Sequence, residues 1–485
     1  PEFPDCLNNL GIALRSLGRT DEAIARFRDA IAIRSDFFDS LLNLGNTVYA
    51  TGDAAAALDW FRRAAALRAD HAGAHNGLGV ALKALGHLDA ALEALRRAVT
   101  LDPQSAEARA NLGNALKQAG HLPEAVAAYR AALTLDPNNA LTWSNLGSAL
   151  HRSGAMTDAL AAFEQALVLD PALPEAHWNR ALVWLALGDY ARGWAEYEWG
   201  FAAGARPLPA RDIPAWHGET LADRGLLVSV EQGFGDAIQF VRFVRRLRPR
   251  VGKIVLECPP ALTDLLRTCA GVDRVVTPEV PDAALPEVAA RVALMSVPAV
   301  LGMGRPEPEE ARPYLAVDEA RLARFTSRIG TAGFRTGLVW AGSPAHQDDR
   351  SRSCPPALLQ RLLSVPGTRF FSLQKGRAPT EAMLLGSELE DLGPALEDFA
   401  DTAAAIACLD LVIAVDTAVA HLAGALGKPV WILLPFAADW RWGQEGETTP
   451  WYPSARLFRQ RRPDDWEGVL DTVRHALDAF LAERP

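Results

Sequence analysis

The chain has 485 residues, of which 49% are hydrophobic and 22% charged, and its formal net charge at pH 7 is −10. This length exceeds one ordinary hydrophobic core and predicts two or three domains, while the composition is that of globular protein. The negative charge argues against general affinity for nucleic acids. No run of about 18 apolar residues is present that could form a membrane-spanning helix.

The cysteines are scattered, with no CxxC pair and no histidines at ligand spacing: Cys6, Cys258, Cys269, Cys354 and Cys408. This arrangement disfavours a zinc site and a disulfide framework. It suits a reducing compartment, so we expect a cytoplasmic protein.

The first 200 residues repeat with a period of 34. Glycine recurs at this step at Gly18, Gly52, Gly86, Gly120, Gly154 and Gly188, and a large ring or leucine recurs at Phe27, Phe61, Leu95, Tyr129, Phe163 and Tyr197. The pattern resembles the tetratricopeptide repeat, a pair of antiparallel helices, and predicts six repeats over residues 4–207. The glycine would end the first helix in a conformation that a side chain resists. Stacked repeats of this kind form a superhelix with a concave face.

Asparagine occupies the position before the repeated leucine in five of the six units, at Asn9, Asn43, Asn111, Asn145 and Asn179, although Arg180 replaces the leucine in the last unit. Asparagine inside a helix costs roughly 0.5 kcal/mol relative to alanine, so the recurrence needs a reason. One interpretation is that the amides tie neighbouring helices together. The other is a ladder of amides along the groove that binds the backbone of an extended peptide. We favour peptide binding, because the ladder resembles that of O-linked N-acetylglucosamine transferases.

A Pro-rich connection at 204–218 separates the repeats from a region in which short apolar strands alternate with amphipathic helices. Expected strands lie at 225–231, 253–258, 274–278, 335–342, 368–375, 410–416 and 428–436, and expected helices at 237–247, 261–269, 401–409 and 418–426. This alternation predicts parallel sheets covered by helices on both faces. The Pro/Glu-rich segment 305–314 divides the region into two Rossmann-like α/β halves, residues 208–315 and 316–485. We expect the final helix to pack across both halves.

Ligands of such sheets bind outside the carboxyl ends of the strands, where three polar loops follow expected strands. In EQGFGD (231–236), Asp236 is either the N-cap of the next helix or a general base for an acceptor hydroxyl. In WAGSPAHQDDRSRS (340–353), Arg350 and Arg352 either hold a phosphate in a planar fork or belong to a solvated surface loop. Lys375, which ends the next strand, could add a positive charge to the same pocket.

A third loop, DTAVAH (416–421), follows the strand 410–416. Thr417 and His421 share one face of the next helix by the i,i+4 rule. The free N–H groups at the start of that helix are suited to a phosphate. We therefore expect Asp416, Thr417 and His421 to serve a nucleotide site, although a lone histidine on a helix more often belongs to ordinary packing.

Several motifs together resemble bacterial proteins that join tetratricopeptide repeats to a heptosyltransferase-like domain: EQGFGDAIQF, WAGSPAHQDDRSRS, FSLQKG, DLVIAVDTAVAHLAGALGKPVW, PFAADWRWG and PWYPSARLFRQ. The resemblance implies the GT-B architecture of two facing Rossmann-like halves and a transferase that needs no metal. It implies that Asp236 is the base, that Arg350 or Arg352 contacts the donor phosphate, and that 416–421 is part of the donor site. One departure is Ala289-Ala290-Arg291, where the family has an Asp-x-His pair.

These observations lead us to expect a metal-independent glycosyltransferase without a cofactor. It would move a sugar from a nucleotide sugar to Ser or Thr hydroxyls of a protein bound by the repeats, with flagellin as the specific expectation. Flagellin glycosyltransferases share this layout. The alternatives are an inactive scaffold, which the altered 289–291 segment favours, and a transferase acting on a saccharide or lipid. Asp348-Asp349 is the nearest approach to a metal-binding DxD pair.

Overall fold

The computed structural model describes residues 3–207, 210–307, 309–344, 349–376, 381 and 386–483. By its internal contacts the chain forms two compact units, residues 1–179 and 180–485. None of the described helices is long and apolar enough to cross a membrane. The five cysteines are free thiols.

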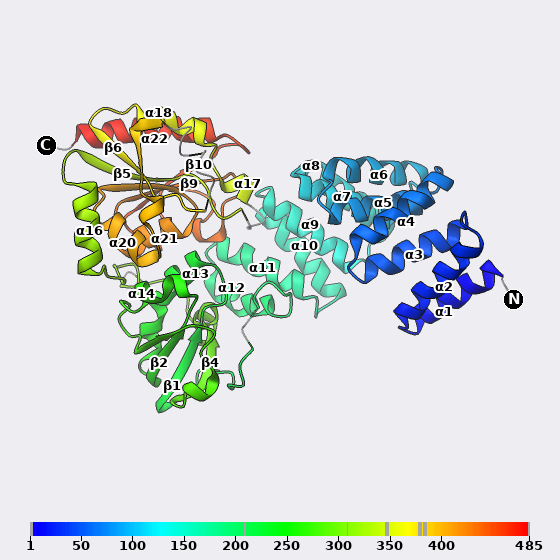
Figure 1. Ribbon diagram of the computed structural model, residues 1–485, viewed down its shortest axis with the longest axis horizontal. Helices are drawn as coiled ribbons and strands as arrows, with labels where there is room; N and C mark the ends of the chain where they lie inside the picture. Colours follow the sequence, from blue (N-terminus) through cyan, green and yellow to red (C-terminus); the bar gives the residue numbers. More distant parts are fainter. Residues whose placement is uncertain are drawn as a thin grey trace. The chain divides into compact units, whose positions relative to one another are not determined.

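The first unit is a series of antiparallel helix pairs (Figure 1). Its helices are α1 (Pro4–Ser16), α2 (Thr20–Ile33), α3 (Phe38–Ala50), α4 (Ala54–Leu67), α5 (Ala72–Ala84), α6 (Leu88–Leu101), α7 (Ala106–Ala119), α8 (Leu122–Leu135), α9 (Ala140–Arg152) and α10 (Met156–Leu169). The next helix, α11 (Pro174–Ala186), begins in this unit and ends in the second. The predicted repeat architecture is confirmed.

The repeated glycines end the first helix of each pair in the left-handed region, with φ from 73° at Gly18 to 92° at Gly52. A Cβ added at these positions would meet nothing within 4 Å. The backbone conformation, and not crowding, therefore requires glycine there.

A second set of glycines lies against the repeated rings, where a larger side chain has no room. A Cβ on Gly11 would stand 2.6 Å from Cε1 of Phe27, and one on Gly113 would stand 2.7 Å from Cε1 of Tyr129. Both rings are fully buried. In each such pair the ring of one helix packs directly on the glycine backbone of the other, and this contact sets the distance between the two helices.

The second unit contains two sheets in which every strand pair is parallel. The first has the order β3-β2-β1-β4 and the second β10-β9-β8-β5-β6-β7. The strands are β1 (Ala222–Ser229), β2 (Val251–Glu257), β3 (Arg274–Val276), β4 (Val288–Ala293), β5 (Phe334–Val339), β6 (Thr368–Ser372), β7 (Leu389–Asp391), β8 (Leu411–Val415), β9 (Val430–Leu434) and β10 (Ala455–Arg459). Two α/β halves of this kind are consistent with the GT-B architecture.

Helices cover these sheets, and several are short. They are α12 (Tyr190–Tyr197), α13 (Phe234–Phe240), α14 (Thr263–Leu266), α15 (Val297–Val300), α16 (Glu319–Ile329), α17 (Asp349–Arg352), α18 (Gln360–Leu363), α20 (Phe399–Ala407), α21 (Ala418–Ala425) and α22 (Trp466–Ala482). The expected helix 237–247 is α13 followed by the 3-10 segment η2 (Val241–Leu247). The final helix α22 differs from expectation: among the described residues, its buried Val469, Val473 and Leu477 belong to a core cluster formed by the second half.

Aromatic rings fasten α12 to the rest of the second unit. The ring centroid of Trp194 lies 5.7 Å from that of Phe240 on α13 and 5.4 Å from that of Trp440, while the Tyr190 centroid lies 5.9 Å from that of Trp451. All five rings are buried. The last helix of the 34-residue period is therefore built into the α/β unit as part of its core.

Candidate functional site

The site forms where α13 of the first half packs on α21 of the second half. Each helix follows a central strand, β1 and β8 respectively, so its first turn lies at the carboxyl edge of its sheet. The approach is close, because a Cβ on Gly235 would stand 2.9 Å from Cδ2 of His421. Glycine at this position therefore lets the two predicted loops meet.

Asp236 is not the N-cap of α13, as one interpretation expected: Gly233 is the N-cap, and Asp236 is the third residue of the helix. Its Oδ2 accepts a hydrogen bond from the Gly233 N–H at 2.9 Å. Its Oδ1 accepts a hydrogen bond from Nη2 of Arg441 and forms an ion pair with it. About a quarter of the Asp236 side chain is exposed (23%), so a substrate hydroxyl can reach it.

Arg441 is a residue of the candidate site that sequence reasoning missed. It lies on the 3-10 turn η9 (Trp440–Trp442) after β9, where it donates to Asp439 Oδ1 at 2.8 Å and to Gln239 Oε1 at 2.6 Å. Burial acts to lower the pKa of Arg441, but Asp439 and Asp236 outweigh it and raise that pKa above its ordinary value. A buried cation thus joins two carboxylates. The spacing Asp-x-Arg after a strand was the available signal in the sequence.

Asp416 and His421 lie close together, and Thr417 is the N-cap of α21. Nε2 of His421 lies 3.8 Å from Oδ1 of Asp416, and its Nδ1 lies 2.9 Å from the Tyr452 hydroxyl. The imidazole also stacks on Trp442 with ring centroids 5.2 Å apart. Burial lowers the pKa of His421 well below its usual value, with a further contribution from Arg441. The imidazole is therefore neutral at physiological pH.

Two polar groups in this site point to a ligand. Burial, reinforced by Asp439, raises the pKa of Asp416 to about 6. Among the described residues Thr417 Oγ1 has no hydrogen-bond partner, although it is buried at the start of α21. An unsatisfied buried hydroxyl costs free energy, which a bound phosphate or sugar hydroxyl would recover.

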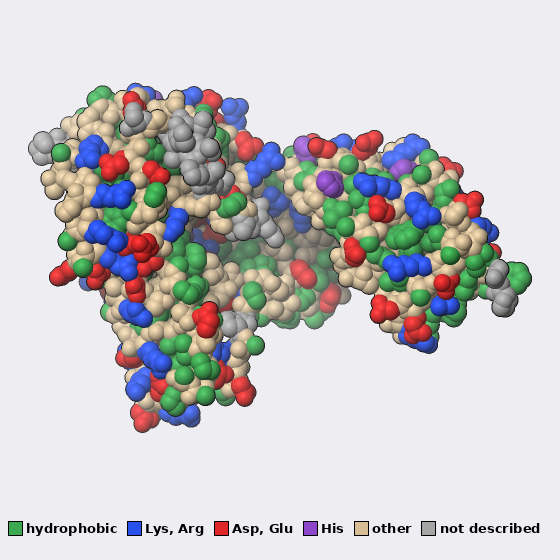
Figure 2. All heavy atoms as spheres, viewed as in Figure 1, with side chains coloured by type: hydrophobic (Ala, Val, Ile, Leu, Met, Phe, Trp, Pro, Cys, Tyr) green, Lys and Arg blue, Asp and Glu red, His purple; other side chains and the backbone are tan. Residues whose placement is uncertain are grey.

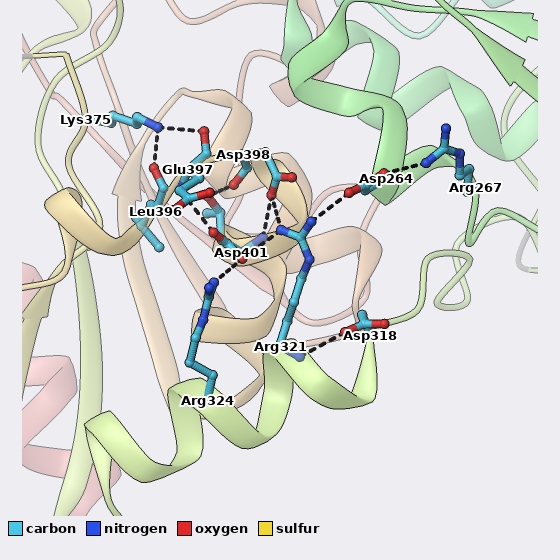
Figure 3. Close-up of polar contacts among 11 residues, drawn as sticks. Asp264, Arg267, Asp318, Arg321, Arg324, Lys375, Leu396, Glu397, Asp398 and Asp401 are labelled. Atoms are coloured by element: carbon cyan, nitrogen blue, oxygen red, sulfur yellow. Dashed lines mark hydrogen bonds and ion pairs between the residues drawn. The ribbon is translucent and has the colours of Figure 1, made fainter.

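The three predicted basic residues differ in their placement. The Arg352 guanidinium lies over Gly342, where a Cβ would collide with it, and its Nη1 is 3.5 Å from the carbonyl oxygen of Asp416. Arg350 is exposed on α17. Lys375 Nζ donates to the carbonyl oxygens of Leu396 and Glu397 (Figure 3). Only Arg352 is thus shown in contact with the 416–421 segment.

Of the remaining predicted features, Asp348 lies outside the described residues. Ala289–Arg291 lies within β4, where Arg291 N–H donates to Pro214 and its carbonyl accepts from Trp216. Among the described residues, no three His, Cys, Asp or Glu side chains form a metal-binding group.

The repeated asparagines make contacts of several kinds. Nδ2 of Asn43 donates to Asn8 and Nδ2 of Asn111 to Asn76, each on the corresponding helix of the preceding repeat. Oδ1 of Asn145 accepts from Lys117, and Nδ2 of Asn179 donates to the Glu175 carbonyl in its own helix. Asn9 is exposed. Asn43 and Asn111 therefore bridge neighbouring helices, and an amide can do this while its remaining donors and acceptors face a groove.

An ionic network links the two halves (Figure 3). Arg321 on α16 donates to Asp264 on α14 of the first half at 2.6 Å, and to Asp398 and Asp401 of the second half at 2.6 and 2.7 Å. Arg324 also pairs with Asp401, which is 1% exposed. This network holds the halves together at a second place besides α13 and α21.

Comparisons with known proteins agree with this structure. Residues 8–72 match a tetratricopeptide repeat family, and 81–120, 113–154 and 148–188 match another. Residues 384–464 match glycosyltransferase family 9 (heptosyltransferase). The chain therefore joins N-terminal tetratricopeptide repeats to a C-terminal glycosyltransferase family 9 domain.

Protein FlbA of Caulobacter vibrioides is a distant homologue, 28% identical over 333 residues, which cover 62% of this chain and 55% of FlbA. The chain thus spans about half the length of this relative. The solved structure of YrrB, a repeat protein with an unusual peptide-binding site, is 26% identical and matches 36% of this chain and 90% of YrrB at a TM-score of 0.31. TTC0263, a repeat protein of Thermus thermophilus, is 25% identical over 38% of this chain and 100% of that chain, at a TM-score of 0.34. Structural likenesses of this strength carry no functional argument.

Proposed function

We propose that this protein moves a sugar from a nucleotide sugar to a Ser or Thr hydroxyl of a protein recruited by the repeats. The observation that carries the proposal is the close packing of α13, which carries Asp236, on α21, which carries His421 beside Asp416. A base for the acceptor beside a site for the donor is what a single displacement step needs. A flagellin-like acceptor, a cytoplasmic location and a reaction without a metal complete the proposal.

The donor would bind at the second half. The start of α21 has free N–H groups for a phosphate, Thr417 Oγ1 is free to donate, and Arg352 supplies positive charge beside them. Arg350 and Lys375 remain proposed donor contacts. The acceptor oxygen attacks the anomeric carbon, the bond from that carbon to the phosphate oxygen breaks, and Asp236 takes the hydroxyl proton. Arg352 would offset the charge that develops on the leaving nucleotide.

The ion pair of Asp236 with Arg441 supports the main alternative. The pair occupies Oδ1 of Asp236, one of the two oxygens that could take the proton of an acceptor hydroxyl. An inactive scaffold would keep such a pair permanently, whereas an enzyme would shift Arg441 towards the donor when substrates bind. The changed residues at 289–291 also favour the scaffold.

Donor binding can be tested by thermal unfolding of the full chain with UDP, GDP, ADP and CMP. Ligand at about 100 times its dissociation constant stabilises the folded state by about 2.7 kcal/mol. We expect one nucleotide class to raise the melting temperature, a smaller rise in Thr417→Val and His421→Ala, and an unchanged rise in the control His475→Ala, which alters an exposed histidine. No response to any nucleotide or nucleotide sugar would favour the scaffold.

Catalysis is tested separately through Asp236→Asn. Loss of a general base lowers the rate by about 10²–10⁴, so donor turnover should fall while the nucleotide-induced stabilisation remains. The exposed Asp223→Asn is the matched control. Unchanged turnover in Asp236→Asn would remove Asp236 from its proposed role.

A further inference from the structure

Three cations lie in one row on successive repeats. Lys83 is on α5, Lys117 on α7 and Arg152 on α9, and these first helices of neighbouring repeats contact each other directly. Nη1 of Arg152 donates to the Lys117 carbonyl at 3.1 Å. The three side chains are only partly exposed.

The row carries charge that the chain itself does not neutralise. Over most of the surface visible in Figure 2, Lys and Arg side chains lie beside Asp and Glu. Within the described part of the chain, in contrast, Lys83, Lys117 and Arg152 form no ion pair with a carboxylate. Burial, together with the nearby charges of Arg152 and Lys83, lowers the pKa of Lys117 to about 8. Like charges that share a partly buried site are costly unless an anion joins them.

The neighbouring groups are suited to a peptide. Nζ of Lys117 donates to Oδ1 of Asn145 at 3.1 Å, so this cation lies beside one of the repeated amides. The buried Tyr129 hydroxyl donates to Asn114 on α7, the helix that carries Lys117. Amides that can bind a backbone therefore lie next to ammonium groups that can bind an acidic side chain.

We propose that Lys83, Lys117 and Arg152 bind a carboxylate of the protein acceptor, an Asp or Glu side chain of a segment lying along the repeats. The inference rests on the proposed function only in taking the partner to be a protein. It adds a specificity for acceptor segments that carry Asp or Glu. A carboxylate placed among these donors makes charge-assisted hydrogen bonds and offsets the repulsion within the row.

The test measures binding of the full chain to an array of short random peptides that are acetylated and amidated. A second set ends in a free carboxylate, and a third replaces Asp and Glu by phosphoserine. We expect the bound peptides to be enriched in Asp or Glu in the first set. In solution, by fluorescence anisotropy, Glu→Gln in the best binder should weaken its binding at least about tenfold, since hydrogen bonds to charged groups have that strength.

Variants decide whether the row is responsible. Lys117→Met should cause the same loss, and the two losses should not add in a double-mutant cycle. Lys83→Met should weaken binding in the same direction, while Arg97→Met, an exposed cation on α6, should not. Melting curves of each variant check that it is folded.

Four results would overturn the proposal: no bound peptides, bound peptides without acidic enrichment, acidic enrichment that survives Lys117→Met, or preference for the C-terminal carboxylate or phosphoserine over Asp and Glu. The nucleotide-induced stabilisation should be equal in wild type and Lys117→Met. Failure at the repeats is thus distinguishable from failure at the donor site.

Discussion

Replacing Lys117 by methionine should stabilise the protein at neutral pH. The fall in the lysine pKa from 10.5 to about 8 corresponds to a cost of about 3 kcal/mol for the charged form. Solvent screening at a partly exposed side chain reduces this to about 2 kcal/mol. Methionine keeps the apolar contacts but loses the hydrogen bond to Asn145, which contributes about 1 kcal/mol. The net gain is about 1 kcal/mol.

The gain in stability of Lys117→Met should depend on pH. Because the folded-state pKa of Lys117 is lower than the unfolded one, the cost is present in full below about pH 8 and disappears as the pH rises towards 10.5. Lys117→Met should therefore melt about 2–4 °C higher than wild type at pH 7, and no higher at pH 10. The assay is thermal unfolding followed by circular dichroism, with Arg97→Met as control. A lower melting temperature at pH 7, or an equal gain at both pH values, would refute the reasoning.

Three other predictions concern single residues. Asp401→Asn removes the buried negative charge that pairs with Arg321 and Arg324 and should cost about 2–3 kcal/mol of stability in urea unfolding. Asp471→Asn, in an exposed ion pair, should cost less than about 1 kcal/mol. Gly120→Ala should cost about 1 kcal/mol, because φ is 86° there; an unchanged midpoint would contradict this. Protonation of Asp416, whose pKa is raised to about 6, removes a negative charge, so nucleotide affinity measured by calorimetry should rise as the pH falls through 6 in wild type and stay level in Asp416→Asn.

The features that could be predicted from the sequence are those that leave a repeating or apolar pattern over a short stretch of residues. A period of 34 with glycine at Gly18 and its counterparts predicts both the helix pairs and the left-handed turns. Apolar runs such as 411–415 predict the central strands. Short edge strands such as β7 (Leu389–Asp391) and β10 (Ala455–Arg459) were missed, since their few residues do not form a clear run.

The site could be predicted only in part, because its contacts join distant segments. Asp236 and Arg441 are 205 positions apart, and no local spacing signals that they form a pair. The capping role differs for a local reason: Gly233 takes the N-cap, which places Asp236 one turn later. The cost of Lys117 depends on burial between repeats and on cations 34 and 35 positions away, so it appears only once the helices are stacked.

The rings that fasten α12 have a consequence for dissecting the chain. A truncation at residue 207, where the repeat period ends, would remove Tyr190 and Trp194 and leave Phe240, Trp440 and Trp451 uncovered. Large apolar rings newly exposed to water favour aggregation. An inactive product of that truncation would therefore report a damaged core and say nothing about acceptor recruitment. A shortened protein should begin near residue 180. The sequence shows six repeats, but the second helix of the sixth belongs to the core of the α/β unit and cannot be removed with the others.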